Sequence, residues 1–171
     1  MWRGRSFLVA LVVATTSLVV ACSGDSTAEP PPLRVDLVGA ALAALEDRLG
    51  EDVAFFEVNA TAQVVNLFVA VEGTSVVQYI YDGESLVGPT EPQAATGTMF
   101  ERGLVNFDDD VLAPVLGELP ESRPTMFVIT GAGTDPVALR VEYRVLMRSS
   151  KGGELAVMVD SGGAIVGTDA E

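Results

Sequence analysis

The sequence predicts an α+β fold made of two copies of one unit. Each copy is a helix plus a four-stranded antiparallel meander, and the copies are packed together or share one sheet. Two stretches carry apolar residues at helical spacing, and segments that alternate between apolar and polar residues follow each of them. The two halves also end on similar residues around a turn. Without a leader of 21 residues, the remaining 150 are enough for one medium domain or two small ones.

The first 21 residues have the pattern of a secretory signal peptide. Arg3 and Arg5 form a basic head, and the apolar run that follows is too short to cross a bilayer comfortably as a helix. Val19 and Ala21 precede the only cysteine, Cys22, and this pattern resembles the lipobox of bacterial lipoproteins. The resemblance implies that the thiol carries a diacylglyceryl group and that Cys22 becomes the first residue of the mature protein.

The anchor also has a physical argument. A lone thiol in an exported chain has no disulfide partner, and acylation removes its exposure to oxidation. Two or more acyl chains give stable anchoring, which one chain does not. The alternatives are an uncleaved amino-terminal membrane helix and ordinary cleavage that leaves a free thiol at Cys22. Residues 22–32 end in three prolines and are expected to be a disordered tether on the outer face of the cell membrane.

The first unit, residues 33–88, begins with the clearer helix. The helix is expected over residues 37–49, with Asp36 as the N-cap and Gly50 at the C-terminal end. Its apolar stripe consists of Val38, Leu42, Leu45 and Leu49. The strands expected after it cover residues 53–60, 64–72, 75–81 and 85–87.

The second unit, residues 107–171, follows a connection over residues 89–106 that contains two prolines. A shorter helix is expected from about residue 110 to 119, because Pro114 would delete an interior hydrogen bond in a helix that began earlier. Three aspartates suit its positive end, and they are Asp108, Asp109 and Asp110. The expected strands cover residues 125–130, 137–148, 154–160 and 164–166.

The ends of the two halves match by residue type. Tyr81, Asp82 and Gly83 precede Leu-Val-Gly, while Asp160 and Gly162 precede Ile-Val-Gly. Chance similarity between two ordinary helix-plus-meander segments is the alternative. On this element order and these turns, most of residues 33–168 resembles tandem PepSY-like or β-lactamase-inhibitor-like lipoproteins of the bacterial envelope. The resemblance implies a binding or modulating role rather than catalysis, and it transfers no site residues.

The composition limits which partners the chain can bind and which catalytic groups it can use. The chain has 24 acidic and 10 basic residues, and loss of Arg3 and Arg5 with the leader would change the net charge from −14 to −16. Such a body is repelled by nucleic acid and by anionic lipids. It has no histidine and its cysteine is assigned to the anchor, so no catalytic residue, metal site or cofactor is expected. Remaining chemistry would depend on carboxylates, hydroxyl groups or Lys151, the only lysine.

The candidate binding residues are Arg140, Arg144 and Arg148. They share one face of the strand expected over residues 137–148 and could bind an anion or a partner protein. The alternative is pairing with carboxylates across strands on a solvated sheet face.

Three other groups of residues are weaker candidates for a site. The aspartates at 108–110 lack the spacing of a calcium loop, so helix capping is preferred. The Gly-Ala-Gly at residues 131–133 leads to a strand, which disfavours a phosphate loop. Of the aromatic side chains at positions 55, 56, 68, 79 and 81, some could face a partner, although core packing is the commoner outcome.

These observations predict a lipid-anchored, non-catalytic module that binds an envelope protein or a peptide through an open sheet face. A carrier of lipid or another hydrophobic ligand is the alternative, and it requires a continuous apolar cavity of roughly several hundred Å³. A hydrolase that uses carboxylates is the third and weakest candidate.

Overall fold

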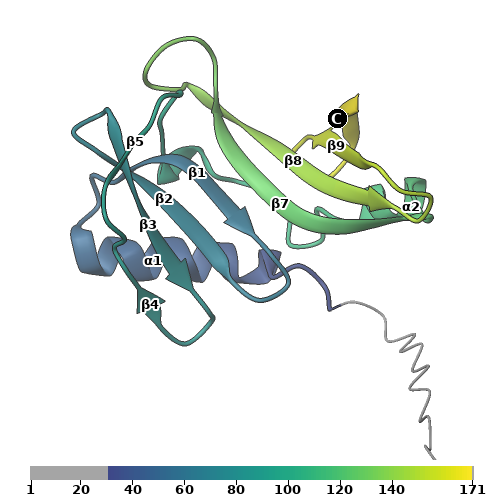
Figure 1. The fold of residues 1–171 in the computed structure, drawn as a ribbon, viewed down its shortest axis with the longest axis horizontal. Coiled ribbons are helices and arrows are strands. Elements are labelled where there is room, and N and C mark those ends of the chain that lie inside the picture. The colour runs from purple at the N-terminus through teal and green to yellow at the C-terminus, as the bar shows by residue number, and fades with distance from the viewer. Residues whose placement is uncertain (1–30, 171) are drawn as a thin grey trace, which may run out of the picture. The chain divides into compact units, whose positions relative to one another are not determined.

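One antiparallel sheet of ten strands organises residues 31–170, which are the residues that the computed structural model describes (Figure 1). The strand order is β10-β9-β8-β7-β1-β2-β3-β4, and β5 pairs with β3 while β6 pairs with β1. The bounds are β1 Ala54–Ala60, β2 Val65–Val71, β3 Ser75–Tyr81, β4 Leu86–Val87, β5 Gln93–Ala94, β6 Phe100–Glu101, β7 Ser122–Ala132, β8 Arg140–Ser149, β9 Glu154–Val159 and β10 Ile165–Ala170. The predicted leader, Cys22 and most of the tether lie outside the described residues.

The two halves of the chain join where β1 pairs with β7. Val58 lies opposite Ile129 and Ala60 lies opposite Phe127, and all four side chains are buried. They belong to one hydrophobic core that continues from β3 to β9. The sheet is therefore continuous across the boundary between the predicted units.

The predicted fold class is wrong. Residues 31–170 contain one ten-stranded sheet and a single α-helix longer than six residues, not two copies of a helix plus a meander. Pairing between distant strands is made by backbone groups that nearly every residue carries, so it leaves no pattern in the sequence. The similarity of the two ends reflects turn chemistry. Asp82 Oδ1 accepts hydrogen bonds from the second and third residues after it, and Asp160 Oδ1 from the second and fourth.

The first helix forms close to its predicted position. A 3-10 turn, η1 (Val35–Leu37), leads into α1 (Val38–Leu49), and Gly50 ends the helix with a φ of 99°. Asp36 does not cap it, because its carboxylate pairs with Arg34 at 3.1 Å. The helix packs on β1, β2 and β4 through the buried side chains Val38, Ala41, Leu42 and Leu45, whereas Leu49 is exposed.

The second helix is shorter than predicted. It is α2 (Ala113–Glu118), with Pro114 in its first turn and Gly117 near its end. The three aspartates at 108–110 lie in the turns before it, and α2 has no side-chain capping bond. The expected capping role is therefore wrong, because the helix begins three residues after Asp110 and Leu112 occupies the N-cap position.

The connection between the halves contributes a short strand that pairs with the start of β1. There β6 pairs with β1, and the Phe100 ring packs 5.7 Å from the Phe55 ring in the core. A second 3-10 turn, η2 (Arg102–Leu104), follows. Gly131 is required where this connection passes β7, because a Cβ at that position would lie 2.5 Å from the Thr98 carbonyl oxygen.

The turn between β7 and β8 is longer than the sequence indicated. The β8 strand begins at Arg140 rather than at residue 137, and β7 extends to Ala132. Val137 instead forms a parallel bridge with Met99. The Met99 N–H donates to the Pro136 carbonyl at 2.8 Å, and the Ala138 N–H donates to the Met99 carbonyl at 2.7 Å. The connection thus draws this segment away from the strand.

Candidate binding surface

Both helices cover the same face of the sheet. The α1 helix lies behind β1 to β3 in Figure 1, and α2 with the segment before it packs on β7. Phe107 from that segment contacts Phe127 and Tyr143 edge-on, at 5.2 and 5.7 Å between ring centroids. The Tyr143 hydroxyl donates to the Asn106 carbonyl at 2.8 Å, and burial raises the pKa of Tyr143. The opposite face, here called the open face, has no helix over it in the described part of the chain.

A chain of carboxamides crosses the open face on β1, β2 and β3. The Gln78 amide donates to Asn66 Oδ1 at 2.9 Å, the Asn66 amide donates to Asn59 Oδ1 at 2.8 Å, and the Asn59 amide donates to Glu57 Oε1 at 2.6 Å. Asn59 is only 4% exposed. These four residues, the amide ladder, bond mainly to one another. Their polar groups are therefore largely satisfied within the fold.

The sequence does not predict the amide ladder. Its members occupy polar positions in strands that alternate between apolar and polar residues, and this alternation is the only signal that the sequence carries for it. The hydrogen bonds join side chains on neighbouring strands, so they depend on register, which the sequence alone did not supply.

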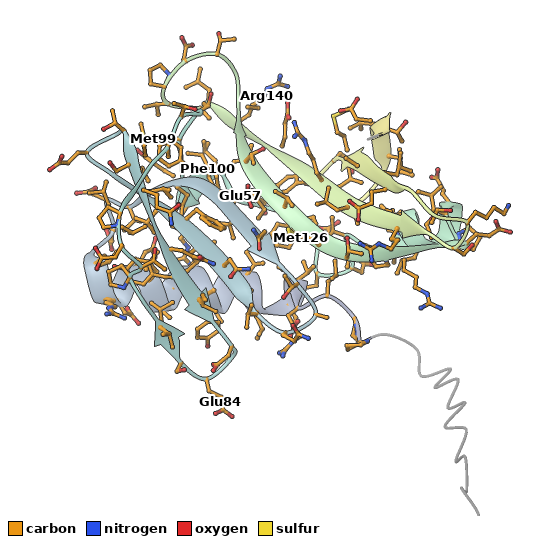
Figure 2. All side chains as sticks on the ribbon, viewed as in Figure 1. Glu57, Glu84, Met99, Phe100, Met126 and Arg140 are labelled. Carbon is orange, nitrogen blue, oxygen red and sulfur yellow. The ribbon has the colours of Figure 1, made fainter. Side chains whose placement is uncertain are left out.

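The three predicted arginines lie on β8, and the register with β7 places all of them on the open face. Figure 2 shows the open face with Glu57, Met126 and Arg140 labelled. Arg144 pairs with Glu142 on the same strand at 2.9 Å, and Arg148 pairs with Glu154 on β9 at 2.7 Å. Arg140 forms no ion pair within residues 31–170. The alternative interpretation, pairing with carboxylates across strands, thus describes Arg148 alone, because the partner of Arg144 lies on the same strand.

Apolar side chains surround Arg144 on this half of the open face. Val128 and Met158 lie directly opposite it on β7 and β9, and Met126 lies opposite Leu146 one row further along. The Nε atom of Arg144 is buried and has no hydrogen-bond partner in residues 31–170. We call Met126, Val128, Arg144, Leu146 and Met158 the arginine-methionine patch. The Arg144 side chain is 40% exposed, so the patch combines an accessible guanidinium with apolar side chains, which is the composition of many protein interfaces.

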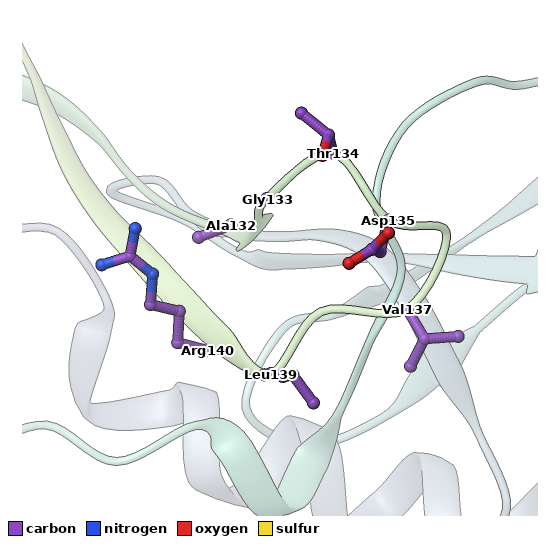
Figure 3. Close-up of a pocket in the computed structure, with 7 residues that line it drawn as sticks. All are labelled: Ala132, Gly133, Thr134, Asp135, Val137, Leu139 and Arg140. Carbon is purple, nitrogen blue, oxygen red and sulfur yellow. The ribbon is translucent and has the colours of Figure 1, made fainter.

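Arg140 lies at one side of a surface pocket of about 410 Å³ at the β7–β8 turn. Figure 3 shows Arg140 and Asp135 on opposite sides of the pocket, and the backbone of the turn runs around the space that separates them. Two apolar side chains of the lining are exposed, Val137 at 54% and Leu139 at 90%. The sequence predicts Arg140 but not Asp135 as a candidate. Residues 131–136 are expected to be a loop and residues 137–139 to be strand, so no local pattern brings the two side chains to one pocket.

The aromatic candidates divide between the two faces. Phe55 and Tyr79 are buried in the core, and Phe56 is half-buried beside Gly97. Phe68 is half-buried on the open face, opposite Glu57 and Gln78. The half-buried Tyr81 donates its hydroxyl hydrogen to the Gly83 carbonyl at 3.1 Å.

Within the described residues, no three His, Cys, Asp or Glu side chains are grouped as metal ligands would be. No helix in residues 31–170 has the length and apolar composition to span a membrane. Comparisons with known protein families, curated proteins and solved structures find no match for this chain.

Proposed function

We propose that this chain is a lipid-anchored module of the cell envelope that binds an envelope protein or a peptide without catalysing a reaction. In this proposal Cys22 carries the lipid on the outer face of the membrane, and the open face of the sheet binds the partner. The arginine-methionine patch carries the proposal, because it joins apolar side chains to a partly exposed guanidinium on the face that no described helix covers.

The chemistry of the patch supports binding more than stability. The Arg144 and Glu142 side chains are 40% and 38% exposed, so their ion pair contributes at most about 1 kcal/mol to folding. Arginine and methionine are both enriched in protein interfaces, where arginine often dominates the binding energy. Methionine adapts its shape to an irregular partner surface.

The lipid-carrier alternative gains no support from the described residues. The large core side chains Phe55, Phe100 and Phe127 are fully buried in one packed cluster. The pocket at the β7–β8 turn is open to solvent and has charged groups on its lining, whereas a lipid requires an enclosed apolar cavity. Native mass spectrometry of protein purified from membranes tests this alternative directly, since a carrier would retain a lipid.

The anchor is tested by intact-mass analysis of the membrane-bound protein. We expect residues 1–21 to be absent and a diacylglyceryl group to be present on Cys22. The Cys22→Ala variant should lose both the modification and the membrane fraction. An unmodified Cys22 in wild-type protein would contradict the proposed anchor.

The binding face is tested by photo-crosslinking in cells from position 130 on the open face, with position 40 on α1 as the control. We expect a specific adduct from Thr130 and none from Ala40. The double variant Arg140→Glu, Arg144→Glu should reduce the adduct. Lys151→Glu makes the same change of charge per residue in the exposed β8–β9 turn and should leave the adduct unchanged. Equal loss in both variants would point to overall charge rather than to this face.

A further inference from the structure

The pocket at the β7–β8 turn has opposite charges on opposite sides. Arg140 lies at the start of β8 and Asp135 lies in the turn, and the apolar side chains of Leu139 and Val137 belong to the same lining (Figure 3). Neither charged side chain forms an ion pair within residues 31–170. A simple anion would meet the Asp135 carboxylate, and a simple cation would meet the Arg140 guanidinium. The charge arrangement therefore favours a ligand with both charges.

The turn that forms the pocket is bound to the rest of the fold. The Met99 N–H and carbonyl bond to Pro136 and Ala138 on the two sides of Val137, and the Thr98 hydroxyl donates to the Gly133 carbonyl at 2.8 Å. Gly131 allows this close approach. The pocket lining is thus ordered before a ligand arrives, which reduces the entropy cost of binding.

The apolar part of the lining indicates the rest of the ligand. Leu139 is 90% exposed and Val137 is 54% exposed, whereas Ala138 between them is buried. Apolar side chains held at a pocket gain free energy when a ligand removes them from water. A ligand with an apolar side chain between its charges matches this lining.

The size of the pocket limits the size of the ligand. Its volume of about 410 Å³ lies within the usual range of small-ligand sites, roughly 300–1,000 Å³. An extended peptide of two or three residues spans at most roughly 7–11 Å, whereas the two charges of a single amino acid are only a few bonds apart. We propose that this pocket binds a short apolar peptide with free termini, its carboxylate on Arg140 and its ammonium group on Asp135.

This inference narrows the proposed function to one class of ligand and rests on its assignment of peptide binding to this side of the protein. Arginine suits the carboxylate, because its planar guanidinium can donate two parallel hydrogen bonds. Arg140 also lies on the open face, and it is the first of the three arginines along β8. The pocket would thus hold one end of the surface that binds the partner.

The test is a titration of the full chain, in detergent, with the peptide Ala-Leu to about 10 mM, followed by NMR or calorimetry. Three companion ligands are N-acetyl-Ala-Leu, Ala-Leu-amide and free leucine. We expect Ala-Leu to bind, and each blocked peptide to bind about fivefold more weakly, as for the loss of one exposed charge pair. Free leucine should bind more weakly than Ala-Leu because it cannot reach both sides.

Two variants assign each terminus to a residue. In Arg140→Gln, amidation of the peptide should have no further effect, whereas acetylation should still weaken binding. In Asp135→Asn the pattern should be reversed, as a double-mutant cycle requires. Arg123→Gln, at the exposed far end of β7, makes the same change of side chain away from the pocket. It is the matched control and should bind like the wild type. The blocked peptides test the wild-type chain as well, so the result does not depend on the variants alone.

No binding of Ala-Leu, or equal binding of free and blocked peptides, would overturn the inference. In that case a partner crosslinked from position 130 and lost on reversal of Arg140 and Arg144 would leave the proposed function intact. Conversely, Ala-Leu binding without any crosslinked partner would support the pocket and contradict the broader open-face role.

Discussion

The two sides of the open face handle their polar side chains in different ways. On β1 to β3, the amide ladder directs three hydrogen bonds from Gln78 to Glu57, all between side chains of the protein. On β7 to β9, the Arg144 side chain is 40% exposed and bonds only Glu142 among the described residues, and Arg140 has no ion pair there. The comparison teaches that polar residues on a sheet face can stabilise the fold or remain available for binding, and that hydrogen-bond partners distinguish the two cases.

The buried face differs between the same two regions. The strands β1 and β2 are covered by a helix of 12 residues, whereas β7 is covered by a short helix and by Phe107, which lies before it. Despite this difference both regions contribute to one core. We therefore expect them to unfold together.

The largest expected effect tests whether the two regions are one cooperative unit. Phe55→Ala on the helix-covered side and Phe127→Ala on the other side each remove a fully buried ring, which should lower the free energy of unfolding by about 3–5 kcal/mol. Urea denaturation of each variant should give a single transition with the wild-type slope. Leu139→Ala, at an exposed position, should change the free energy little. Two separate transitions would show that the regions are independent.

The next effect concerns the amide ladder. Asn59→Ala removes the acceptor of Asn66 and the donor to Glu57 at a position that is almost fully buried. The free energy of unfolding should fall by about 1–3 kcal/mol. Gln78→Ala at the half-buried end of the ladder removes one bond and should cost less than Asn59→Ala. Equal losses of unfolding free energy in the two variants would mean that the burial of Asn59 does not add to the stabilising effect of the ladder.

A smaller effect on stability is expected for the arginine-methionine patch. Arg144→Met removes an exposed ion pair and an unbonded Nε, so the free energy of unfolding should change by no more than about 1 kcal/mol. The crosslinked adduct from position 130 should nevertheless decrease. Asn59→Leu provides the contrast. It should lower the free energy of unfolding, whereas the yield of the crosslinked adduct from position 130 should change little. If Arg144→Met lowered the free energy of unfolding but left the adduct unchanged, Arg144 would serve the fold rather than binding.

The smallest effect concerns the turn after β3. Backbone N–H groups of Ser85 and Glu84 bond the Asp82 carboxylate and lower its pKa from the usual 3.8. A depressed pKa contributes stability that is fully present above pH 3.8 and is lost as the pH falls through the lower folded value. Wild type should therefore be slightly more stable than Asp82→Asn at pH 6, and the difference should shrink below pH 3.8. Thermal unfolding at several pH values measures it, and a difference independent of pH would contradict the assignment.

The sequence supplied much of the local structure and little of the site. Alternation placed residues on the correct strands, because the two faces of a half-buried strand differ in polarity. Helical spacing found α1 but overestimated α2, since Pro114 and Gly117 shorten it. Arg140, Arg144 and Arg148 were correctly placed on one face of one strand, whereas Asp135 and the amide ladder required knowledge of the turn and of the register.

By itself the sequence determined the acidic charge, the absence of histidine, the position of the one cysteine and the period of each strand. These follow from residue identity and from local spacing alone. Only the tertiary structure decided that β1 pairs with β7, that Asn59 bonds Asn66, and that Arg140 and Asp135 line one pocket. The physical reason is that these contacts join segments far apart in the chain, and many registers are compatible with the same local pattern until the core is packed.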